Sequence, residues 1–278
     1  MRITLATSNR CMVGGVVTYV RSLLPLLAAR GQDLALLLEH EKDPAAPGVA
    51  DGISGLPCWT AGPGRRAQAM QDLEKWRPDV VFAQGMADPE LDAALMERWP
   101  TLLFGHAYYG TCVSGLKRFA FPAVRACQRT FGLGCLACYL PLRCGGLNPF
   151  AMQRQYSQQA RRLRILQDVR LVAAASRHMR AEYVRHGLHE ERVRLLRLYP
   201  ATASPTPEPP GSRKMTGNIL FAGRLSAEKG ARLLVPAVCH AARLLGRPLE
   251  LVVAGSGPLA AEVETQGRRM GVPVRLTG

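Results

Sequence analysis

Residues 218–230 decide the fold of this chain, and their sequence is NILFAGRLSAEKG. Residues 218–222 form the apolar run of a buried strand, and residues 230–245 have the apolar spacing of a helix. The loop between them lies where an α/β sheet binds phosphate, because amide groups at a helix N-terminus face the ligand. Arg224 and Lys229 add two positive charges that suit phosphate oxygens. The alternative is an ordinary loop whose Arg and Lys only face solvent.

The motif GRLxxEKG, which follows ILFA, resembles the one that opens the nucleotide domain of family-4 glycosyltransferases, enzymes with the GT-B fold. Residues 252–258, VVAGSGP, are similar to the strand and turn that come next in that family. The resemblance implies that Arg224 and Lys229 hold the diphosphate of the sugar donor and stabilise the leaving nucleotide. It also implies a donor-domain loop shaped by Gly223, Gly255 and Gly257.

The resemblance implies an α/β fold class with two Rossmann-like doubly wound domains, the second incomplete. Repeated strand–helix patterns predict a Rossmann-like domain over residues 1–199, which the resemblance implies is the acceptor-side domain. Residues 107–150 interrupt these patterns with a Cys-, Gly-, Pro- and Arg-rich stretch of no sustained period, so we expect an irregular insert there. Residues 200–216 form a Pro-rich linker, and residues 217–278 a partial nucleotide-sugar-binding domain.

The apolar periods also predict the individual elements. In the first domain we expect strands at residues 2–6, 34–38, 79–83, 101–104, 171–175 and 192–198, and helices at residues 16–30, 72–76, 88–98, 152–167 and 177–186. In the second we expect strands at residues 218–222, 249–254 and 274–277, and helices at residues 230–245 and 259–270. A doubly wound sheet has about five or six strands, so the second domain looks truncated.

Three residues of the first domain complete the candidate site. Gly14 and Gly15 resemble the family's N-terminal glycine loop, which turns backbone amides toward the donor diphosphate; alone, the pair is also typical of a tight turn. The loop matches neither the Walker A nor the dinucleotide fingerprint, so ATP and NAD binding are not indicated.

His106 follows a strand where the family often carries a histidine near the reacting sugar, and is the candidate catalytic residue. The alternative is a structural histidine at a strand end. Ser176 suits a helix N-cap.

The net charge of +15 is concentrated in one stretch. Residues 98–167 contain ten Lys or Arg residues and no Asp or Glu, which favours a polyanionic partner. No nucleic-acid-binding motif accompanies these residues, so we expect no nucleic acid. An anionic membrane surface or a diphosphate-bearing acceptor fits better, and basic residues on ordinary solvated faces remain the alternative.

The N-terminus lacks the apolar segment of a signal peptide, and no uninterrupted apolar run is long enough to span a membrane. We therefore expect a cytoplasmic protein, with a peripheral position at the inner face of the membrane as a further hypothesis.

Five of the eight cysteines fall within residues 112–144. They are Cys112, Cys127, Cys135, Cys138 and Cys144. These thiols suffice for a structural zinc or iron–sulfur centre, although only one CxxC pair is present. The alternative is a set of free buried thiols. We expect no metal for catalysis, because positive side chains and amides can replace a divalent cation at the diphosphate.

The resemblance implies a retaining transfer of a sugar from a nucleotide diphospho-sugar to a glycan or glycolipid acceptor, in cell-surface polysaccharide or glycolipid assembly. The family's two-glutamate donor-sugar motif would lie beyond Gly278, so these residues alone are expected to be inactive. The competing hypothesis is a non-catalytic binding or regulatory module whose insert is held by a metal.

Overall fold

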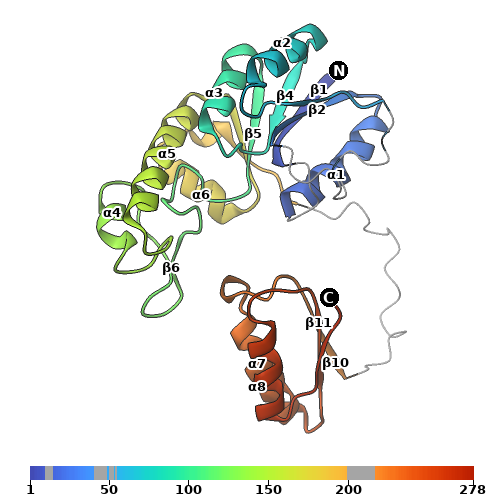
Figure 1. Cartoon of the computed structure of the whole chain (residues 1–278), viewed down its shortest axis with the longest axis vertical. Helices are drawn as coiled ribbons and strands as arrows, with labels where there is room; N and C mark the ends of the chain where they lie inside the picture. The colour runs from blue at the N-terminus through green and yellow to red at the C-terminus, as the bar shows by residue number, and fades with distance from the viewer. Residues whose placement is uncertain (10–14, 41–48, 50–52, 54, 199–216) are drawn as a thin grey trace. The chain divides into compact units, whose positions relative to one another are not determined.

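The computed structural model describes residues 1–9, 15–40, 49, 53, 55–198 and 217–278. The chain divides into two compact units, Met1–Ala203 and Ser204–Gly278 (Figure 1). The expected linker at residues 200–216 lies outside the described residues. None of the helices in the described residues combines the length and the apolar character needed to cross a bilayer.

The first unit is built on a seven-stranded sheet in the order β3-β2-β1-β4-β5-β8-β9, and all neighbouring strands are parallel. From β1 the chain moves outward to β2 and β3, and from β4 it moves outward in the opposite direction. The point where the order reverses therefore lies between β1 and β4, which is where such sheets bind ligands. The strands are β1 (Arg2–Asn9), β2 (Asp33–His40), β3 (Cys58–Thr60), β4 (Val80–Ala83), β5 (Thr101–Gly105), β8 (Leu171–Ala174) and β9 (Val193–Leu195).

Helices cover both faces of this sheet because successive strand residues point to opposite sides. On one face, Leu5 and Leu36 pack against Val20 of α1. On the other face, buried residues of the strands pack against α2 and α3, and further along against α5 and α6. The doubly wound prediction is confirmed for this unit. The helices are α1 (Gly15–Ala28), α2 (Arg66–Trp76), α3 (Pro89–Arg98), α5 (Pro149–Asp168) and α6 (Arg177–Arg185), with a 3-10 turn η1 (Glu190–Arg192).

The expected elements are present, but several boundaries differ. The helix predicted at residues 72–76 begins at Arg66, and β3 was not predicted because a three-residue strand shows no period. The helix predicted at residues 152–167 begins at Pro149, because Asn148 Oδ1 accepts hydrogen bonds from the amides of Phe150 and Ala151, at 2.9 and 3.2 Å. The N-cap role of Ser176 is confirmed by a 3.2 Å bond from the amide of Met179 to its hydroxyl.

The insert at residues 107–150 is more regular than expected. It contains the antiparallel hairpin of β6 (Arg118–Phe119) and β7 (Arg125–Ala126) and the short helix α4 (Gly134–Tyr139). Two-residue strands and a six-residue helix are too short to give a period, which is why the sequence pattern missed them. Figure 1 shows α4 and the hairpin projecting from the body of the seven-stranded sheet.

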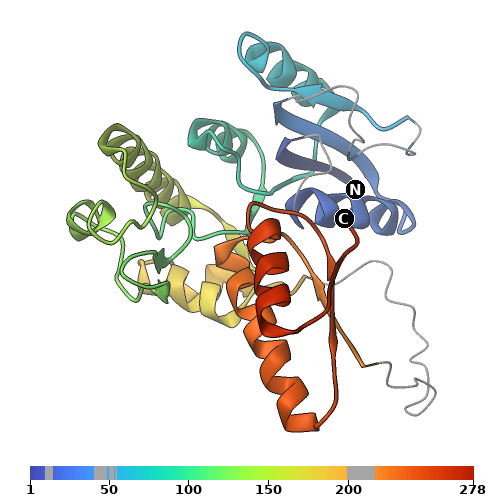
Figure 2. The same cartoon turned by 60° about the horizontal axis from the view of Figure 1, so that its bottom comes forward.

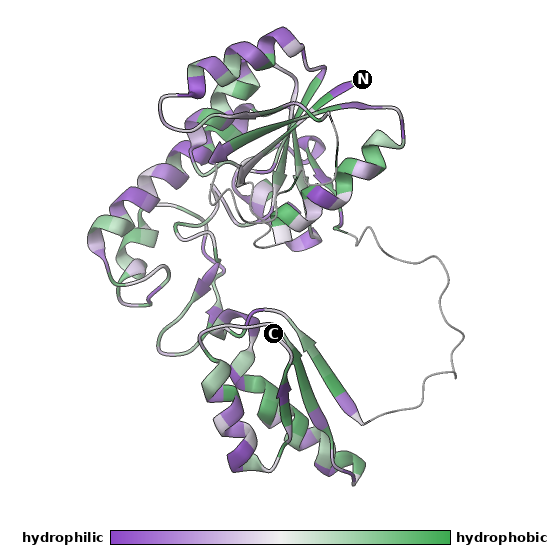
Figure 3. Ribbon diagram, turned by 45° about the vertical axis from the view of Figure 1, so that its right-hand side comes forward, coloured by the Kyte–Doolittle hydropathy of each residue, from purple (hydrophilic) through white to green (hydrophobic). Residues whose placement is uncertain are grey.

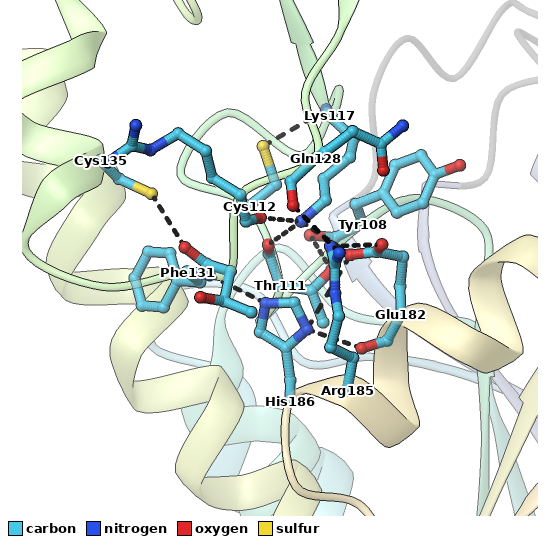
Figure 4. A network of polar contacts seen from close by, with 12 residues as sticks. Tyr108, Thr111, Cys112, Lys117, Gln128, Phe131, Cys135, Glu182, Arg185 and His186 are labelled. Atoms are coloured by element: carbon cyan, nitrogen blue, oxygen red, sulfur yellow. Dashed lines mark hydrogen bonds and ion pairs between the residues drawn. The ribbon is translucent and has the colours of Figure 1, made fainter.

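A buried ion pair fastens the insert to α6. Lys117 Nζ lies 2.7 Å from a carboxylate oxygen of Glu182, and both side chains are almost fully buried. The same ammonium group donates to the carbonyl oxygens of Thr111 and Arg129, at 3.2 and 2.6 Å. His186 Nε2 accepts a 2.9 Å bond from the amide of Phe131 (Figure 4). These bonds tie the insert to a helix that packs on the sheet.

Burial opposes the ionisation of Glu182, but hydrogen bonds from Lys117 and Arg185 outweigh it, and the pKa of this carboxyl is lowered. Glu182 is therefore an anion that needs its partners, since an uncompensated charge in the interior is costly.

We predict that Lys117→Met lowers the free energy of unfolding of the first unit by about 3–5 kcal/mol, because it leaves the buried Glu182 carboxylate without its ammonium partner. Urea unfolding followed by tryptophan fluorescence measures this, since Trp59, Trp76 and Trp99 all belong to this unit.

The matched control is Lys75→Met, which removes an ammonium group from an exposed ion pair with Asp72 on α2. It should leave the urea midpoint unchanged. Equal effects of the two substitutions would contradict a fastening role for Lys117.

The second unit is a parallel three-stranded sheet in the order β10-β11-β12. Its two helices lie on the same side of the strands (Figures 1 and 2). Leu251 and Val253 are buried beneath them, whereas Leu220, which pairs with Val252 on the opposite face, is 67% exposed. The second Rossmann-like unit is thus incomplete, with one covered face. Its elements are β10 (Asn218–Ala222), η2 (Ala227–Lys229), α7 (Ala231–Leu245), β11 (Glu250–Ala254), α8 (Ala260–Met270) and β12 (Val274–Leu276). Figure 3 shows that the strands of both sheets are mainly hydrophobic.

Candidate functional site

Gln84 and His106 meet at the carboxyl ends of β4 and β5, beside the point where the strand order reverses. His106 Nε2 donates to Gln84 Oε1 at 2.7 Å. Gln84 Nε2 in turn donates to the carbonyl oxygen of Phe82 at 3.5 Å, which directs Oε1 toward the imidazole. The amide of Gln84 also donates to the carbonyl oxygen of Ala6 in β1 at 2.8 Å. The pair is therefore held by the strands of the sheet itself.

The imidazole of His106 lies among aromatic rings. Its centroid is 4.3 Å from that of Phe104 and 5.7 Å from that of Tyr19 on α1. Burial lowers the pKa of His106 from 6.5 to about 4. The side chain is consequently neutral at physiological pH, with its Nε2 proton engaged by Gln84.

A close approach of α6 positions the backbone around His106. A Cβ at Gly105 would collide with the hydroxyl group of Tyr183. That hydroxyl donates to the carbonyl oxygen of Ala107 at 3.4 Å. The residues on both sides of His106 are thus held by one buried tyrosine, which explains the glycine at the end of β5.

Two buried carboxyl groups hold the loop that follows Gln84. The carboxylate of Glu39, at the end of β2, accepts from the amides of Ala87 and Asp88 at 2.6 and 2.8 Å. Asp92 on α3 accepts from the amide of Met86 at 3.2 and 3.3 Å. Burial raises the pKa of Asp92 to about 7 despite a nearby guanidinium group. The loop therefore has a defined conformation set from two neighbouring elements.

Arg162 of α5 completes this frame. Its guanidinium group donates to the carbonyl oxygens of Met86 and Ala87 at 2.7 and 3.1 Å. It lies 3.6 Å from a carboxyl oxygen of Asp92 and over the ring of Tyr109, 4.8 Å from the centroid. Arg162 links the loop after β4 to the start of the insert, so the insert has a fixed relation to the Gln84–His106 pair.

The predicted glycine loop is described only in part. Gly14 lies outside the described residues, and Gly15 is the first residue of α1. A Cβ at Gly15 would meet no described atom within 4 Å. Packing among the described residues therefore does not require a glycine here, and the contact with a donor diphosphate stays a prediction.

In the second unit, glycines bring two loops into backbone contact. A Cβ at Gly255 would collide with the carbonyl group of Gly223, and one at Gly257 with that of Leu225. The amide of Leu225 donates to the carbonyl oxygen of Ser256 at 2.9 Å. Gly223 and Gly255 also have φ angles of 150° and 145°, which favour glycine. The loop that carries Arg224 and Lys229 is thus built against the loop after β11.

Arg224 and Lys229 lie on the first of these loops, and both side chains are exposed. Between them, Leu225 is fully buried and Ser226 nearly so. The backbone is anchored by these buried residues while the two cationic side chains face solvent. A phosphate group can therefore reach both cations without displacing packed side chains.

The five cysteines of the insert are free thiols. Burial raises the pKa of Cys144 to about 11, and the nearby Cys127 and Cys112 add to this effect. Among the described residues no three His, Cys, Asp or Glu side chains form a group that could hold a metal ion. A structural zinc or iron–sulfur centre at Cys112, Cys127, Cys135, Cys138 and Cys144, and the non-catalytic module built on it, stay hypotheses.

Residues 13–197, which include α1, the seven-stranded sheet after β1 and the Gln84–His106 pair, match Glycosyltransferase Family 4. The chain belongs to this family. No curated protein matches this Family 4 glycosyltransferase.

Solved structures share its fold at low sequence identity. The apo form of the lipopolysaccharide outer core galactosyltransferase WaaB matches with a TM-score of 0.56 and 11% identity, over 100% of this chain and 68% of that one. Anabaena HepE in complex with UDP-glucose matches with a TM-score of 0.55 and 14% identity, over 100% and 69%. S. aureus TarM, in complex with UDP and alpha-GlcNAc-glycerol among other ligands, has a TM-score of 0.58 and 7% identity, over 100% and 77%. These matches confirm the GT-B fold class with an incomplete second domain.

The family resemblance pointed to His106, but the sequence did not indicate its partner Gln84 or the residues that hold the neighbouring loop, Glu39, Asp92 and Arg162. Gln84 and Glu39 are single polar residues at the end of an apolar run. That signal is visible in the sequence, but it does not show that residues so far apart in the chain meet.

We predict that His106 of the Family 4 glycosyltransferase stays neutral until the pH falls to about 4. Because this pKa is depressed below 6.5, the stabilising contribution is complete above pH 6.5 and is lost as the pH falls toward 4. NMR of the histidine ring protons measures the titration directly, and His106→Gln identifies the resonance. A midpoint near 6.5 would show that the imidazole is solvated and not buried.

Proposed function

We propose that this Family 4 glycosyltransferase moves a sugar from a nucleoside diphospho-sugar to a glycan or glycolipid acceptor, with retention at the anomeric carbon. The observation that carries the proposal is the exposure of Arg224 and Lys229 on a loop whose backbone is fixed by Leu225, Gly255 and Gly257. The complexes of HepE with UDP-glucose and of TarM with UDP support a uridine diphosphate donor as the first to test.

Departure of a nucleoside diphosphate places negative charge on its terminal phosphate oxygen. Arg224 can fork onto two phosphate oxygens, and Lys229 adds a point charge. Most amide groups of this loop already donate to backbone carbonyl oxygens, among them Leu225 to Ser256 and Lys229 to Ser226, so the two side chains supply the positive charge. Cations carried by a fixed backbone stabilise the developing charge with little movement of the loop, and this lowers the barrier to transfer.

On the acceptor side, we assign His106 to a hydrogen bond with a sugar hydroxyl group through Nδ1. Its Nε2 proton is engaged by Gln84, and burial keeps the ring neutral. Nδ1 of this neutral ring carries only a lone pair, so it accepts the hydrogen bond from the hydroxyl group and adds no fixed charge. Its proposed role is therefore contact with the reacting sugar, while charge stabilisation falls to Arg224 and Lys229.

The free thiols of the described cysteines favour a reducing compartment, and we propose that the reaction occurs in the cytoplasm. The chain spans about two thirds of the length of WaaB and HepE. Low transfer activity of these 278 residues alone stays a prediction. Binding of the nucleotide tests the proposed site independently of turnover.

We predict that Arg224→Ala and Lys229→Ala each weaken binding of UDP at least about tenfold, because each removes a charge-assisted phosphate contact of about 1.5–3 kcal/mol. Isothermal titration of the purified chain with UDP measures the change. The control is Arg243→Ala, an exposed arginine in the last turn of α7. Equal affinities of the three variants and the original chain would rule out this loop as the diphosphate site.

We further predict that EDTA leaves UDP affinity unchanged within about twofold, because Arg224 and Lys229 supply the positive charge that offsets the diphosphate. Titration in the presence of EDTA, and again with added Mg²⁺, makes this comparison. Binding that disappears on chelation and returns with Mg²⁺ would instead assign charge neutralisation to the metal.

A further inference from the structure

The insert displays an unusual number of exposed apolar side chains. Seven of the fourteen large hydrophobic residues that are exposed in the described chain lie within residues 107–150, a stretch of 44 residues. Four of these exposed side chains lie in two places. Phe121 and Val124 are in the turn between β6 and β7, and Leu147 and Phe150 are at the start of α5. Phe150 is 81% exposed and Leu147 63% exposed. Surface exposure on this scale costs free energy unless a partner covers it.

Arginine side chains accompany these apolar residues. The guanidinium carbon of Arg143 lies over the ring of Phe121, 4.9 Å from its centroid. Arg125 lies 5.3 Å from the ring centroid of Phe119 in the same hairpin. Arg154 follows Phe150 by four residues on α5, so both lie on the same face of that helix. Positive charge is thus placed directly beside the exposed apolar side chains.

This charge is not neutralised by any of the described residues. Lys117, Arg161 and Arg162, which belong to the same acid-free stretch, pair with Glu182, Glu90 and Asp92 respectively. Arg125, Arg143 and Arg154 form no ion pair with any residue that the structure describes, and all three are exposed. These three cations are therefore balanced, while Arg125, Arg143 and Arg154, around the exposed apolar residues, are free to meet an external anion.

We propose that this insert surface, formed by Phe121, Val124, Leu147 and Phe150 with Arg125, Arg143 and Arg154, docks on a lipid bilayer that contains anionic headgroups. The apolar side chains enter the boundary between headgroups and acyl chains, and the guanidinium groups contact the lipid phosphates. An anionic bilayer can contact both the apolar side chains and the guanidinium groups, whereas a partner bound by charge alone would leave the apolar side chains in water. The proposal stands apart from the sugar-transfer reaction, because it concerns only where the protein is held.

Nucleic acid and a second copy of the chain are the competing partners. The apolar residues of the insert surface include two aliphatic side chains, whose contacts with bases lack the stacking that aromatic platforms provide. A second copy would bring the same arginines together, and like charges repel across an isologous contact. Charge complementarity therefore favours an anionic bilayer over both.

Vesicle sedimentation tests the proposal with the complete chain. Vesicles of phosphatidylcholine with about two fifths phosphatidylglycerol should bind the protein, and pure phosphatidylcholine vesicles should bind it far more weakly. Because each basic residue near an anionic surface contributes about fivefold, the triple variant Arg125→Gln, Arg143→Gln, Arg154→Gln should bind about 100-fold more weakly. The double variant Leu147→Ser, Phe150→Ser should also bind at least about tenfold more weakly, since both side chains would otherwise enter the bilayer.

Two matched controls come from the second unit. Arg243→Gln, Arg268→Gln, Arg269→Gln removes the same number of exposed charges, and Leu233→Ser, Leu244→Ser removes leucines that are 69% and 75% exposed. Neither should change vesicle binding more than about twofold. Because Leu147 and Phe150 pack against little, their replacement should leave the urea midpoint unchanged, which excludes misfolding as the cause of weaker binding.

A second measurement reports insertion itself. In Phe150→Trp, the indole fluorescence should shift to the blue on addition of anionic vesicles, and brominated lipids should quench it. Equal binding to neutral vesicles, loss of binding in the second-unit controls alone, or an unquenched indole would overturn the proposal. So would tight, salt-sensitive binding to an RNA oligonucleotide without vesicle binding, or a dimer in light scattering that the insert variants abolish.

Discussion

The reversal of strand order between β1 and β4 is the constraint on which the candidate site depends. Chain segments leave these two strands in opposite directions, so the space at their carboxyl ends is not filled by a crossing connection. Gln84 occupies that end of β4, and its amide is bonded to Ala6 of β1. His106, one strand further, is thereby placed at the opening with a fixed partner. The topology creates the space, and two hydrogen-bonded side chains define its chemistry.

In the first unit, buried charged side chains fix the conformation of loops and add little net stability. Glu39 and Arg162 are almost fully buried, and each bonds to backbone groups of the loop after β4. Moving such groups from water costs several kcal/mol per ion, which good hydrogen bonds roughly offset. Their benefit is a single loop conformation, because any other arrangement leaves a charge without partners. The Lys117–Glu182 pair applies the same principle to the insert, which has only a small apolar cluster of its own.

The fold could be predicted from the sequence wherever the apolar period and the loop chemistry agree. At β10 and α7 the predicted bounds match the observed ones within one residue. The structure of the insert could not be predicted, because the strands β6 and β7 are too short to show a period. One signal was available and not used: Asn148 followed by Pro149 is a typical helix start. Within the site, His106 could be found from the family resemblance, but Glu39 could not. Its partners, the amides of Ala87 and Asp88, are nearly fifty residues away in sequence.

The glycines that resemble family motifs are not all glycine for the same structural reason. Gly255 and Gly257 are required by packing, since a Cβ on either would strike the loop that carries Arg224. Gly15 has no such neighbour among the described residues, so packing within them does not explain its small size. Gly255 and Gly257 let the loop after β11 pack against the backbone of the loop from Gly223 to Gly230, while Arg224 and Lys229 stay exposed. The two stretches thus have different roles: Gly255 and Gly257 fix the backbone, and Arg224 and Lys229 leave two cations exposed, and a ligand with charged oxygens benefits from both.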